Sequence, residues 1–234
     1  MMDTEIKVLG VFPVQAVVTN LAEGFRQETG HSVMLAFTTS GAIRQKLAAG
    51  EPADVIILND YEIDELARQG FVAAGTRTDI ARFGMGVVVR QGAPLPDIST
   101  PEALKQTLLS AKSIAYGNPD RTRGGAHFAS VLQRLGIADA VKAKTLLSNG
   151  GAASSKAVAR GEAELGVQGM SKDILVDGVT LVGPLPKDLQ KIMTLSASVA
   201  ARSVVPEAAR AFVAFLARPS FKSKFAEAGL DYRE

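Results

Sequence analysis

Cysteine and tryptophan are both absent from the 234 residues of this chain. Without cysteine, a disulfide framework, a thiolate metal site, an iron–sulfur cluster and a cysteine nucleophile are all excluded. The two histidines, His31 and His127, lie far apart in the sequence, which disfavours an imidazole-rich metal site. The composition therefore predicts a protein without a metal site, and we expect no cofactor.

An excess of charge of one sign is also missing. Lys plus Arg number 26 and Asp plus Glu number 24, so the formal net charge is only +2. Nucleic-acid-binding proteins usually concentrate far more positive charge on one face, and we therefore expect no nucleic-acid partner. Hydrophobic residues make up 47% of the chain and charged residues 21%, which is typical of a soluble globular protein.

Long apolar runs are lacking. No segment approaches the roughly 20 uninterrupted apolar residues of a membrane helix, so we expect no membrane insertion. The apolar run at 8–11 is too short for the core of a signal peptide. As written, the sequence predicts a cytoplasmic protein. A chain shortened at its N-terminus would look the same, and the protein would then be periplasmic.

What the sequence does contain is an alternation of short apolar segments and helical patterns. In the first third we expect strands at 6–11, 32–37 and 54–58 and helices at about 14–29, 41–49 and 61–69. Strands that are apolar on both faces and separated by helices are typical of a parallel sheet covered on both sides. The fold class is therefore α/β.

Two longer strands, expected at 83–90 and 194–201, bracket the central third of the chain. If each crosses between lobes, residues 1–83 and 195–234 form one lobe and residues 84–194 form the other. Each lobe is then a mainly parallel sheet flanked by helices. Ligands of such sheets bind outside the carboxyl ends of the strands, which predicts a ligand cleft between the lobes.

Three segments carry a family resemblance. They are the segment 38–60, which contains Gly50-Glu51-Pro52-Ala53-Asp54, the segment 117–136 after a second-lobe strand, and the late helix–strand turn at 159–173. Together with the order of elements, they resemble the type II periplasmic solute-binding proteins, and most closely the molybdate-binding branch. The resemblance implies a two-lobed fold, a small anionic ligand in the cleft and, if the protein is exported, an ABC transporter as partner.

The chain departs from the molybdate-binding pattern at two positions. That branch offers a hydroxyl from its first strand–helix turn, where this chain has Phe12 and Pro13, and a tyrosine hydroxyl in its late turn, where this chain has Gln168-Gly169-Met170. Only Thr38, Thr39 and Ser40 keep the hydroxyl-rich character. A tetrahedral oxyanion needs such neutral donors, so the departures disfavour molybdate.

Arginines stand where new ligand contacts are expected. Arg121 and Arg123 lie in the loop after a second-lobe strand, just before Gly124, where we expect a helix to begin. A guanidinium group binds a carboxylate through two parallel hydrogen bonds, which suits an organic acid. The alternative is that both arginines point into solvent. Phe12 and Pro13 would add an apolar wall for an organic ligand.

The other candidates each have two interpretations. Thr39 and Ser40 either cap a helix or contact the ligand, or do both. Asn149-Gly150-Gly151 is either a backbone anion nest or a turn, and the Gln168 amide either contacts ligand or satisfies a neighbouring carbonyl. His127 is more typical of a packed or surface helix residue than of a catalyst, and Lys156 of a solvated one.

We expect the chain to bind a small anion, an organic polycarboxylate, as a solute-binding-protein-like receptor. One alternative is a cofactor-independent isomerase of a tricarboxylate, because the same fold occurs in aconitate isomerase. Arg121, Arg123, Arg44 and the first-lobe hydroxyls would then clamp carboxylates, while His127 or Asp120 would move the proton. A second alternative is a molybdate or oxyanion transport component. A sensor domain of a separate regulator is the least favoured interpretation.

Overall fold

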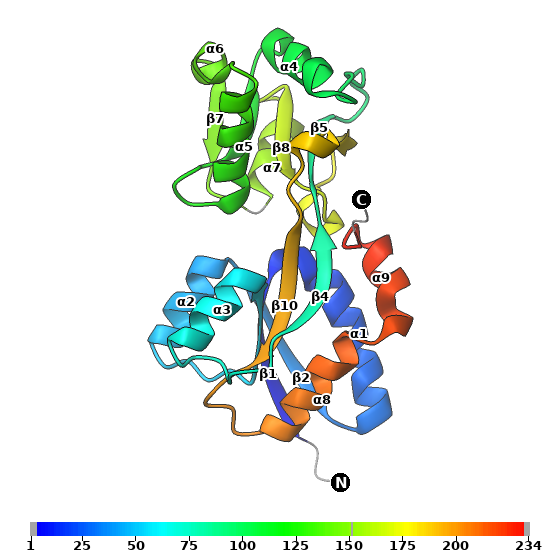
Figure 1. The fold of residues 1–234 in the computed structure, drawn as a ribbon. Helices are drawn as coiled ribbons and strands as arrows, with labels where there is room; N and C mark the ends of the chain where they lie inside the picture. The colour runs from blue at the N-terminus through cyan, green and yellow to red at the C-terminus, as the bar shows by residue number, and fades with distance from the viewer. Residues whose placement is uncertain (1–3, 151, 232–234) are drawn as a thin grey trace. The chain divides into compact units, whose positions relative to one another are not determined.

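Two five-stranded sheets carry the architecture of residues 4–150 and 152–231, which are the parts that this computed structural model describes. Residues 4–82 and 193–231 form unit 1, and residues 83–192 form unit 2. Helices cover the sheet of each unit (Figure 1), so the predicted α/β class with two units of sheet and helix is confirmed.

Unit 1 has the strand order β2-β1-β3-β10-β4. Its strands are β1 (Glu5–Val11), β2 (Ser32–Thr38), β3 (Val55–Asn59), β4 (Thr78–Phe83) and β10 (Met193–Val199). Its helices are α1 (Gln15–Thr29), α2 (Ser40–Ala48), α3 (Asp60–Arg68), α8 (Pro206–Leu216) and α9 (Lys222–Glu227). In Figure 1, α2 and α3 lie over one face of this sheet, and α1 and α8 lie over the other.

The pairing register of unit 1 places three strand ends together. β1 pairs in parallel with β2, so Val11 lies opposite Thr38, and in parallel with β3, so Gly10 lies opposite Ile57. β10 pairs with β3 in the antiparallel direction, so this sheet is mixed. The carboxyl ends of β1, β2 and β3 therefore share one edge, and the turns that follow them are neighbours.

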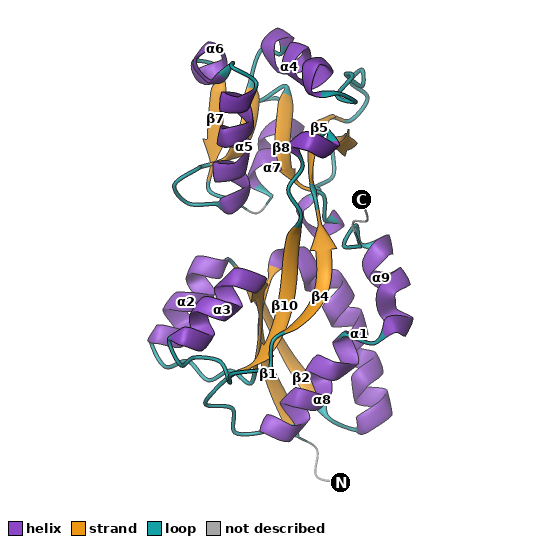
Figure 2. Ribbon diagram, in the orientation of Figure 1, coloured by secondary structure: helices purple, strands orange, loops and turns teal. Residues whose placement is uncertain are grey.

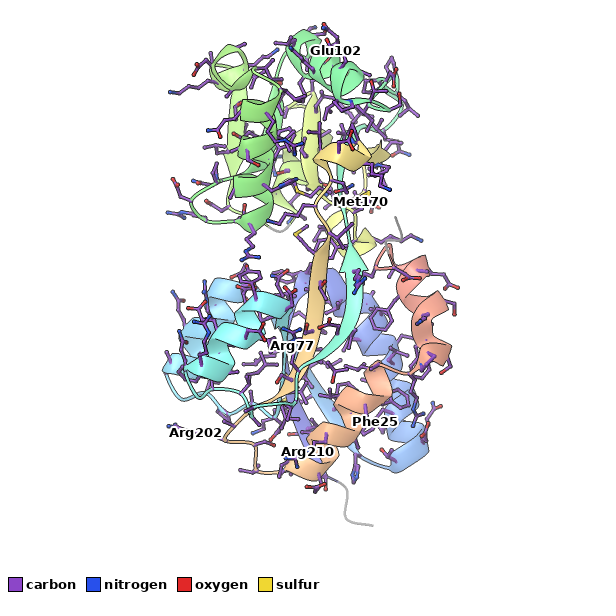
Figure 3. All side chains as sticks on the ribbon, in the orientation of Figure 1. Phe25, Arg77, Glu102, Met170, Arg202 and Arg210 are labelled. Atoms are coloured by element: carbon purple, nitrogen blue, oxygen red, sulfur yellow. The ribbon has the colours of Figure 1, made fainter. Side chains whose placement is uncertain are left out.

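An aromatic cluster holds the helices of unit 1 against each other. The Phe25 ring of α1, labelled in Figure 3, lies 5.1 Å from the ring of Phe212 and 5.3 Å from that of Phe215, both on α8. Both pairs are edge-on, the arrangement that the charge distribution of aromatic rings favours. This packing of α1 against α8 joins the N-terminal and C-terminal parts of the chain in one core.

Unit 2 has the strand order β7-β6-β8-β5-β9. Its strands are β5 (Met85–Arg90), β6 (Ile114–Gly117), β7 (Thr145–Ser148), β8 (Leu165–Gly169) and β9 (Val179–Pro184). Its helices are α4 (Pro101–Ser110), α5 (Arg123–Arg134), α6 (Ala138–Lys142) and α7 (Ala153–Ala159), seen in purple in Figure 2. β6 runs parallel to β7 and β8, whereas β5 runs antiparallel to β8 and β9.

Successive residues of β6 show that both faces of this sheet are covered. Ala115 packs in a buried cluster with Ala157 and Val158 of α7. The next residue, Tyr116, points to the opposite face, where its ring lies 5.0 Å from that of Phe128 on α5. β6 is therefore apolar on both faces because a helix covers each of them.

The expected long strand at 83–90 is wrong in its boundaries. β4 ends at Phe83, the first residue of unit 2, and β5 begins at Met85. At this break, a side chain makes the hydrogen bonds that a neighbouring strand would make. The Gln190 Oε1 accepts from the Met85 N–H at 2.7 Å, and its Nε2 donates to the Met85 carbonyl at 2.8 Å. A Cβ at Gly84 would lie 3.0 Å from this amide, so glycine lets it approach. The other expected strand, 194–201, is β10, which ends two residues earlier and lies wholly within the unit 1 sheet.

None of the helices that residues 4–150 and 152–231 form is long and apolar enough to cross a bilayer.

Candidate functional site

In unit 1, the turn after β1 carries the first two candidate residues. Phe12 and Pro13 begin a single 3₁₀ turn, Phe12–Val14, that leads directly into α1. The Phe12 side chain is 37% exposed, although it is a large apolar residue. Exposure at the carboxyl end of a strand leaves this ring available to an apolar part of a ligand.

The hydroxyl residues follow β2 at the same edge. Thr38 is its last residue, and Thr39 caps α2 because its Oγ1 accepts a hydrogen bond from the Ala42 N–H at 3.3 Å. Ser40, the first residue of α2, donates from its Oγ to the Glu62 Oε2 at 3.0 Å. Capping is thus observed for Thr39, whereas the Ser40 hydroxyl is directed to a carboxylate.

Two residues of this edge, Asn59 and Glu62, were missed in the sequence. Glu62 is only 3% exposed, and its Oε2 also accepts from the Asn59 Nδ2 at 2.6 Å. The signal was present: Asn59 comes directly after a buried strand, and Glu62 stands three positions later, the spacing of a capping box. The pattern predicts a local cap, but the structure directs Glu62 to the side chains of the first residue of α2 and the last residue of β3.

In unit 2, α5 begins one residue earlier than expected. It starts at Arg123, and Thr122 is its N-cap, because the Gly125 N–H donates to the Thr122 Oγ1 at 3.1 Å. The same hydroxyl donates to the Asn118 carbonyl at 3.1 Å. A side-chain cap with these two bonds stabilises the turn between β6 and α5.

Glycines allow α5 to approach β6 closely. A Cβ at Gly125 would collide with the carbonyl of Gly117, and a Cβ at Gly117 would collide with the Thr122 Oγ1. Gly124 is less crowded, since its nearest neighbour would be the Met85 Cε at 3.5 Å. The N-terminus of α5, with its partial positive charge, is therefore held at the carboxyl end of β6.

The loops after β6 and β7 meet through two side chains. The Arg121 Nη1 lies 3.5 Å from the Asn149 Oδ1, at the limit of a hydrogen bond. Both residues are exposed, as is Arg123. Gly150 has φ +90, and its carbonyl accepts from the Ala153 N–H at 3.3 Å, so this segment forms a turn. Gly151 lies outside the described residues.

The Gln168 side chain hydrogen-bonds to neighbouring backbone groups. Of the two roles expected for it, ligand contact and satisfaction of a neighbouring carbonyl, the structure shows the second. It is 7% exposed; its Oε1 accepts from the Ser155 N–H at 3.0 Å, and its Nε2 donates to the Ile174 carbonyl at 2.9 Å. Both ends of the amide are thus engaged. The adjacent Met170, labelled in Figure 3, packs over Gly86, where a Cβ would lie 2.8 Å from its Cγ.

The remaining candidates are spread over different surroundings. The His127 Nε2 lies 2.8 Å from the Leu189 carbonyl, and burial lowers the pKa of its imidazole below the ordinary value. Asp120 is exposed, and its N–H donates to the Asn118 Oδ1 at 2.9 Å. Lys156 is exposed as expected, and Arg44 lies 3.9 Å from the Glu65 carboxylate. His127 is therefore tied to the protein backbone.

The geometry of each unit suits an anion. In unit 2, two exposed guanidinium groups flank a helix N-terminus that glycines bring close to a strand end. In unit 1, a hydroxyl-rich turn and an exposed aromatic ring share one sheet edge. Among the residues that the structure describes, no three His, Asp or Glu side chains gather as a metal site.

Residues 6–231 match the family described as bacterial extracellular solute-binding protein. The chain belongs to this family. The chain is similar to curated proteins of two kinds. One is an aconitate isomerase from Pseudomonas sp, 33% identical over 233 residues, which are 97% of this chain and 87% of that protein. The other is the molybdate-binding protein ModA of Azotobacter vinelandii, 29% identical over 92% of this chain and 85% of that protein.

A solved structure agrees with the family assignment at the level of fold. The periplasmic molybdate-binding protein of Azotobacter vinelandii superimposes with a TM-score of 0.79 at 21% identity, covering 98% of this chain and all of that one. The predicted solute-binding-protein fold is thereby confirmed, and so is the resemblance to the molybdate-binding branch.

Proposed function

We propose that this solute-binding family member binds a small organic anion with more than one carboxylate, at the carboxyl ends of its strands. The observation that carries the proposal is the pair of exposed arginines, Arg121 and Arg123, on either side of the cap residue Thr122. A guanidinium offers two parallel N–H donors that match the two oxygens of a carboxylate. The N-terminus of α5 adds backbone donors beside them.

The late turn argues against molybdate. The molybdate-binding branch, as we interpret it, uses a tyrosine hydroxyl there. In this chain a Cβ at Gly169 would lie 2.6 Å from the Phe83 ring, so a larger side chain there would require that ring to shift. Pro13 likewise brings no hydroxyl to the first turn. Two neutral donors for a tetrahedral oxyanion are missing, whereas the exposed Phe12 ring suits a carbon skeleton.

Calorimetric titration tests this proposal directly. Wild-type protein is titrated with molybdate, citrate, tricarballylate and trans-aconitate under one set of conditions. We expect the organic acids to bind and molybdate to bind far more weakly. Tight molybdate binding without any organic-acid signal would refute the proposal.

Variants in each unit extend the test. Ser40→Ala in unit 1 and Arg121→Ala in unit 2 are titrated with the organic acid that wild type binds best. A loss of affinity in Ser40→Ala assigns a ligand contact to unit 1, and a loss in Arg121→Ala assigns one to unit 2. An exposed control, Glu51→Gln, removes one charge beside Lys46 and is expected to leave the affinity unchanged.

A second candidate function is isomerisation of a tricarboxylate, which the 33% identical aconitate isomerase favours. Such a reaction moves one proton between two carbons and needs no cofactor. Incubation with cis- or trans-aconitate, followed by chromatography of the products, tests this candidate. Interconversion above the uncatalysed rate supports this candidate. Binding without interconversion excludes it, and the receptor function then remains.

For the receptor function, we propose that the protein acts outside the cytoplasm. Its partner there would be the membrane component of an ABC transporter. The family match, to extracellular solute-binding proteins, supports this choice. The genes beside this one discriminate the two functions: permease and ATPase genes favour transport, whereas organic-acid catabolism genes favour the isomerase.

A further inference from the structure

The Ser40–Glu62 contact restricts what kind of ligand oxygen unit 1 can receive. A serine hydroxyl has one hydrogen to donate, and an ionised carboxylate only accepts. The Ser40 Oγ donates to the Glu62 Oε2 at 3.0 Å, so its single hydrogen is already used. The Ser40 oxygen therefore offers only lone pairs to an approaching group.

We propose that Glu62 makes Ser40 a hydrogen-bond acceptor, so that a ligand oxygen contacting Ser40 must arrive with a hydrogen of its own. This inference rests on the proposed function, and it names the chemistry that the site selects. The hydrogen comes either from an alcohol, as in a hydroxy acid, or from a proton taken up together with a carboxylate. Glu62 is thus a specificity-determining residue that acts through Ser40.

The environment of Glu62 keeps this arrangement in place. Its side chain is 3% exposed, and its Oε2 also accepts from the Asn59 Nδ2 at 2.6 Å. None of the ion pairs among the described residues includes Glu62. Both of its partners are neutral side chains, one after the carboxyl end of β2 and one at the carboxyl end of β3, the two strands that pair with β1. Among the residues that the structure describes, no cation competes with Ser40 for the carboxylate, and water has little access to it.

A purely structural role explains this geometry less well. As the residue three positions after the N-cap Asn59, Glu62 is placed to accept from the backbone N–H of Asn59 itself. Its Oε2 instead accepts from the Asn59 side chain and from the Ser40 hydroxyl of α2, 22 positions away in the sequence. The carboxylate thus orients a hydroxyl that belongs to another helix.

The arrangement also discriminates against a fully ionised oxyanion. A molybdate oxygen carries no hydrogen, so at Ser40 it would meet lone pairs with a buried carboxylate behind them. Each unmatched pair of acceptors costs affinity because neither oxygen recovers the hydrogen bonds that it made to water. Discrimination by an unpaired polar group is usually stronger than discrimination by size.

The test compares two ligands that differ by one hydroxyl. Citrate and tricarballylate share three carboxylates, and only citrate has the alcohol. Wild-type protein is titrated with each at mildly alkaline pH, in two buffers of different ionisation enthalpy, so that proton uptake is measured as well. We expect either citrate to bind about tenfold more tightly, or tricarballylate to match it while about one proton is taken up. The first result identifies an alcohol as the source of the hydrogen, and the second a bound proton.

Two variants then assign the effect to the pair. Ser40→Ala removes the acceptor and should abolish the citrate preference or the proton uptake. Glu62→Gln can turn its amide N–H₂ toward Ser40, which frees the Ser40 hydrogen for the ligand. We therefore expect tricarballylate and molybdate to bind about tenfold more tightly to Glu62→Gln than to wild type. The matched charge control is again Glu51→Gln, for which no change is expected.

The failures can be told apart. Equal binding of citrate and tricarballylate by wild type, without proton uptake, overturns this inference and leaves the proposed carboxylate function standing. Binding of neither acid overturns the proposed function and this inference with it. A citrate preference that survives in Ser40→Ala assigns the hydroxyl contact to another residue and also overturns the inference.

Discussion

Strand β3 has a buried carboxylate at each end, and the two differ in what they bind. At the amino end, Asp54 accepts from the backbone N–H groups of Lys7 and Val204 at 2.9 and 3.3 Å, and from the Ser203 Oγ at 2.7 Å. At the carboxyl end, the partners of Glu62 within the described part of the chain are the side chains of Ser40 and Asn59. Both residues are 3% exposed.

The comparison separates two carboxylates of equal burial by the kind of partner that each has. Asp54 ties together β1 and the segment after β10 through backbone N–H groups. The partners of Glu62 are side chains. We therefore expect Asp54 to serve stability, and Glu62 to matter more for the ligand that we propose.

The largest effect is expected at the amino end. Asp54→Ala leaves two backbone N–H groups and one hydroxyl without their acceptor at a part-buried position. A fully buried unpaired donor costs about 1–3 kcal/mol, so each of these costs up to that amount. We expect the free energy of unfolding to fall by about 3–5 kcal/mol, measured by urea denaturation. A loss below about 1 kcal/mol would remove the distinction between the two carboxylates.

A glycine pair tests the rigidity of the carboxyl end in unit 2. Gly125→Ala places a Cβ against the Gly117 carbonyl, and we expect a loss of about 2–3 kcal/mol in the free energy of unfolding. Gly124→Ala is the matched control, since its Cβ makes only ordinary contact and alanine favours the helix. Equal effects of the two substitutions would show that close approach of α5 to β6 is not required.

Arg123 tests whether the carboxyl end of unit 2 serves binding rather than stability. A charge-assisted bidentate contact is worth about 1.5–3 kcal/mol, so Arg123→Ala should weaken organic-acid binding about tenfold to a hundredfold. Arg123→Lys should lose much of this affinity, because an ammonium lacks the planar fork. The melting temperature of ligand-free protein should stay nearly constant, since Arg123 is exposed. Normal binding with a lowered melting temperature would make Arg123 structural.

Glu62→Gln sharpens the comparison with Asp54. Glutamine has the same shape as glutamate. Its amide can direct either its oxygen to the Asn59 Nδ2 or its N–H₂ group to the Ser40 hydroxyl. We therefore expect the free energy of unfolding to change by less than about 1 kcal/mol, far less than for Asp54→Ala. A destabilisation as large as that of Asp54→Ala would place Glu62 among the structural residues.

The smallest effect concerns His127. Burial is the main cause of its lowered pKa, so its imidazole is neutral in the folded protein over a wider pH range than in the unfolded chain. Its contribution to stability is present above the unfolded pKa and is lost as the pH falls through that value toward the folded one. An NMR titration should find a His127 pKa below the ordinary 6.5. A pKa above it would contradict the lowering by burial.

Local features of the fold were predictable from the sequence. A threonine followed by a proline is a recognisable helix start, and at the start of α4 the Thr100 Oγ1 accepts from the Ala103 N–H at 3.1 Å, with Pro101 next in the chain. The apolar segment after Asp54 is β3, and Gly30 ends α1 with a left-handed φ of 77. Each of these depends on residues within one turn of each other, so composition and spacing suffice.

The candidate site was predictable only in part. The hydroxyls at 38–40 and the arginines at 121 and 123 stood out because strand ends are recognisable in the sequence. Their bonding was not: the Gln168 amide spans to Ser155 and Ile174, and the Gln190 amide pairs with Met85, which lies 105 positions away. An amide in a sequence looks the same whether it meets backbone or ligand.

The sequence by itself determined the α/β alternation, the helix caps and the residue types available at each strand end. Only the tertiary structure decided the antiparallel direction of β10 in unit 1, and that Glu62 bonds to Ser40 rather than to its own helix. The physical reason is that caps and periodic patterns are short-range. The direction of a hydroxyl hydrogen depends instead on which acceptor the folded chain brings within about 3 Å of it.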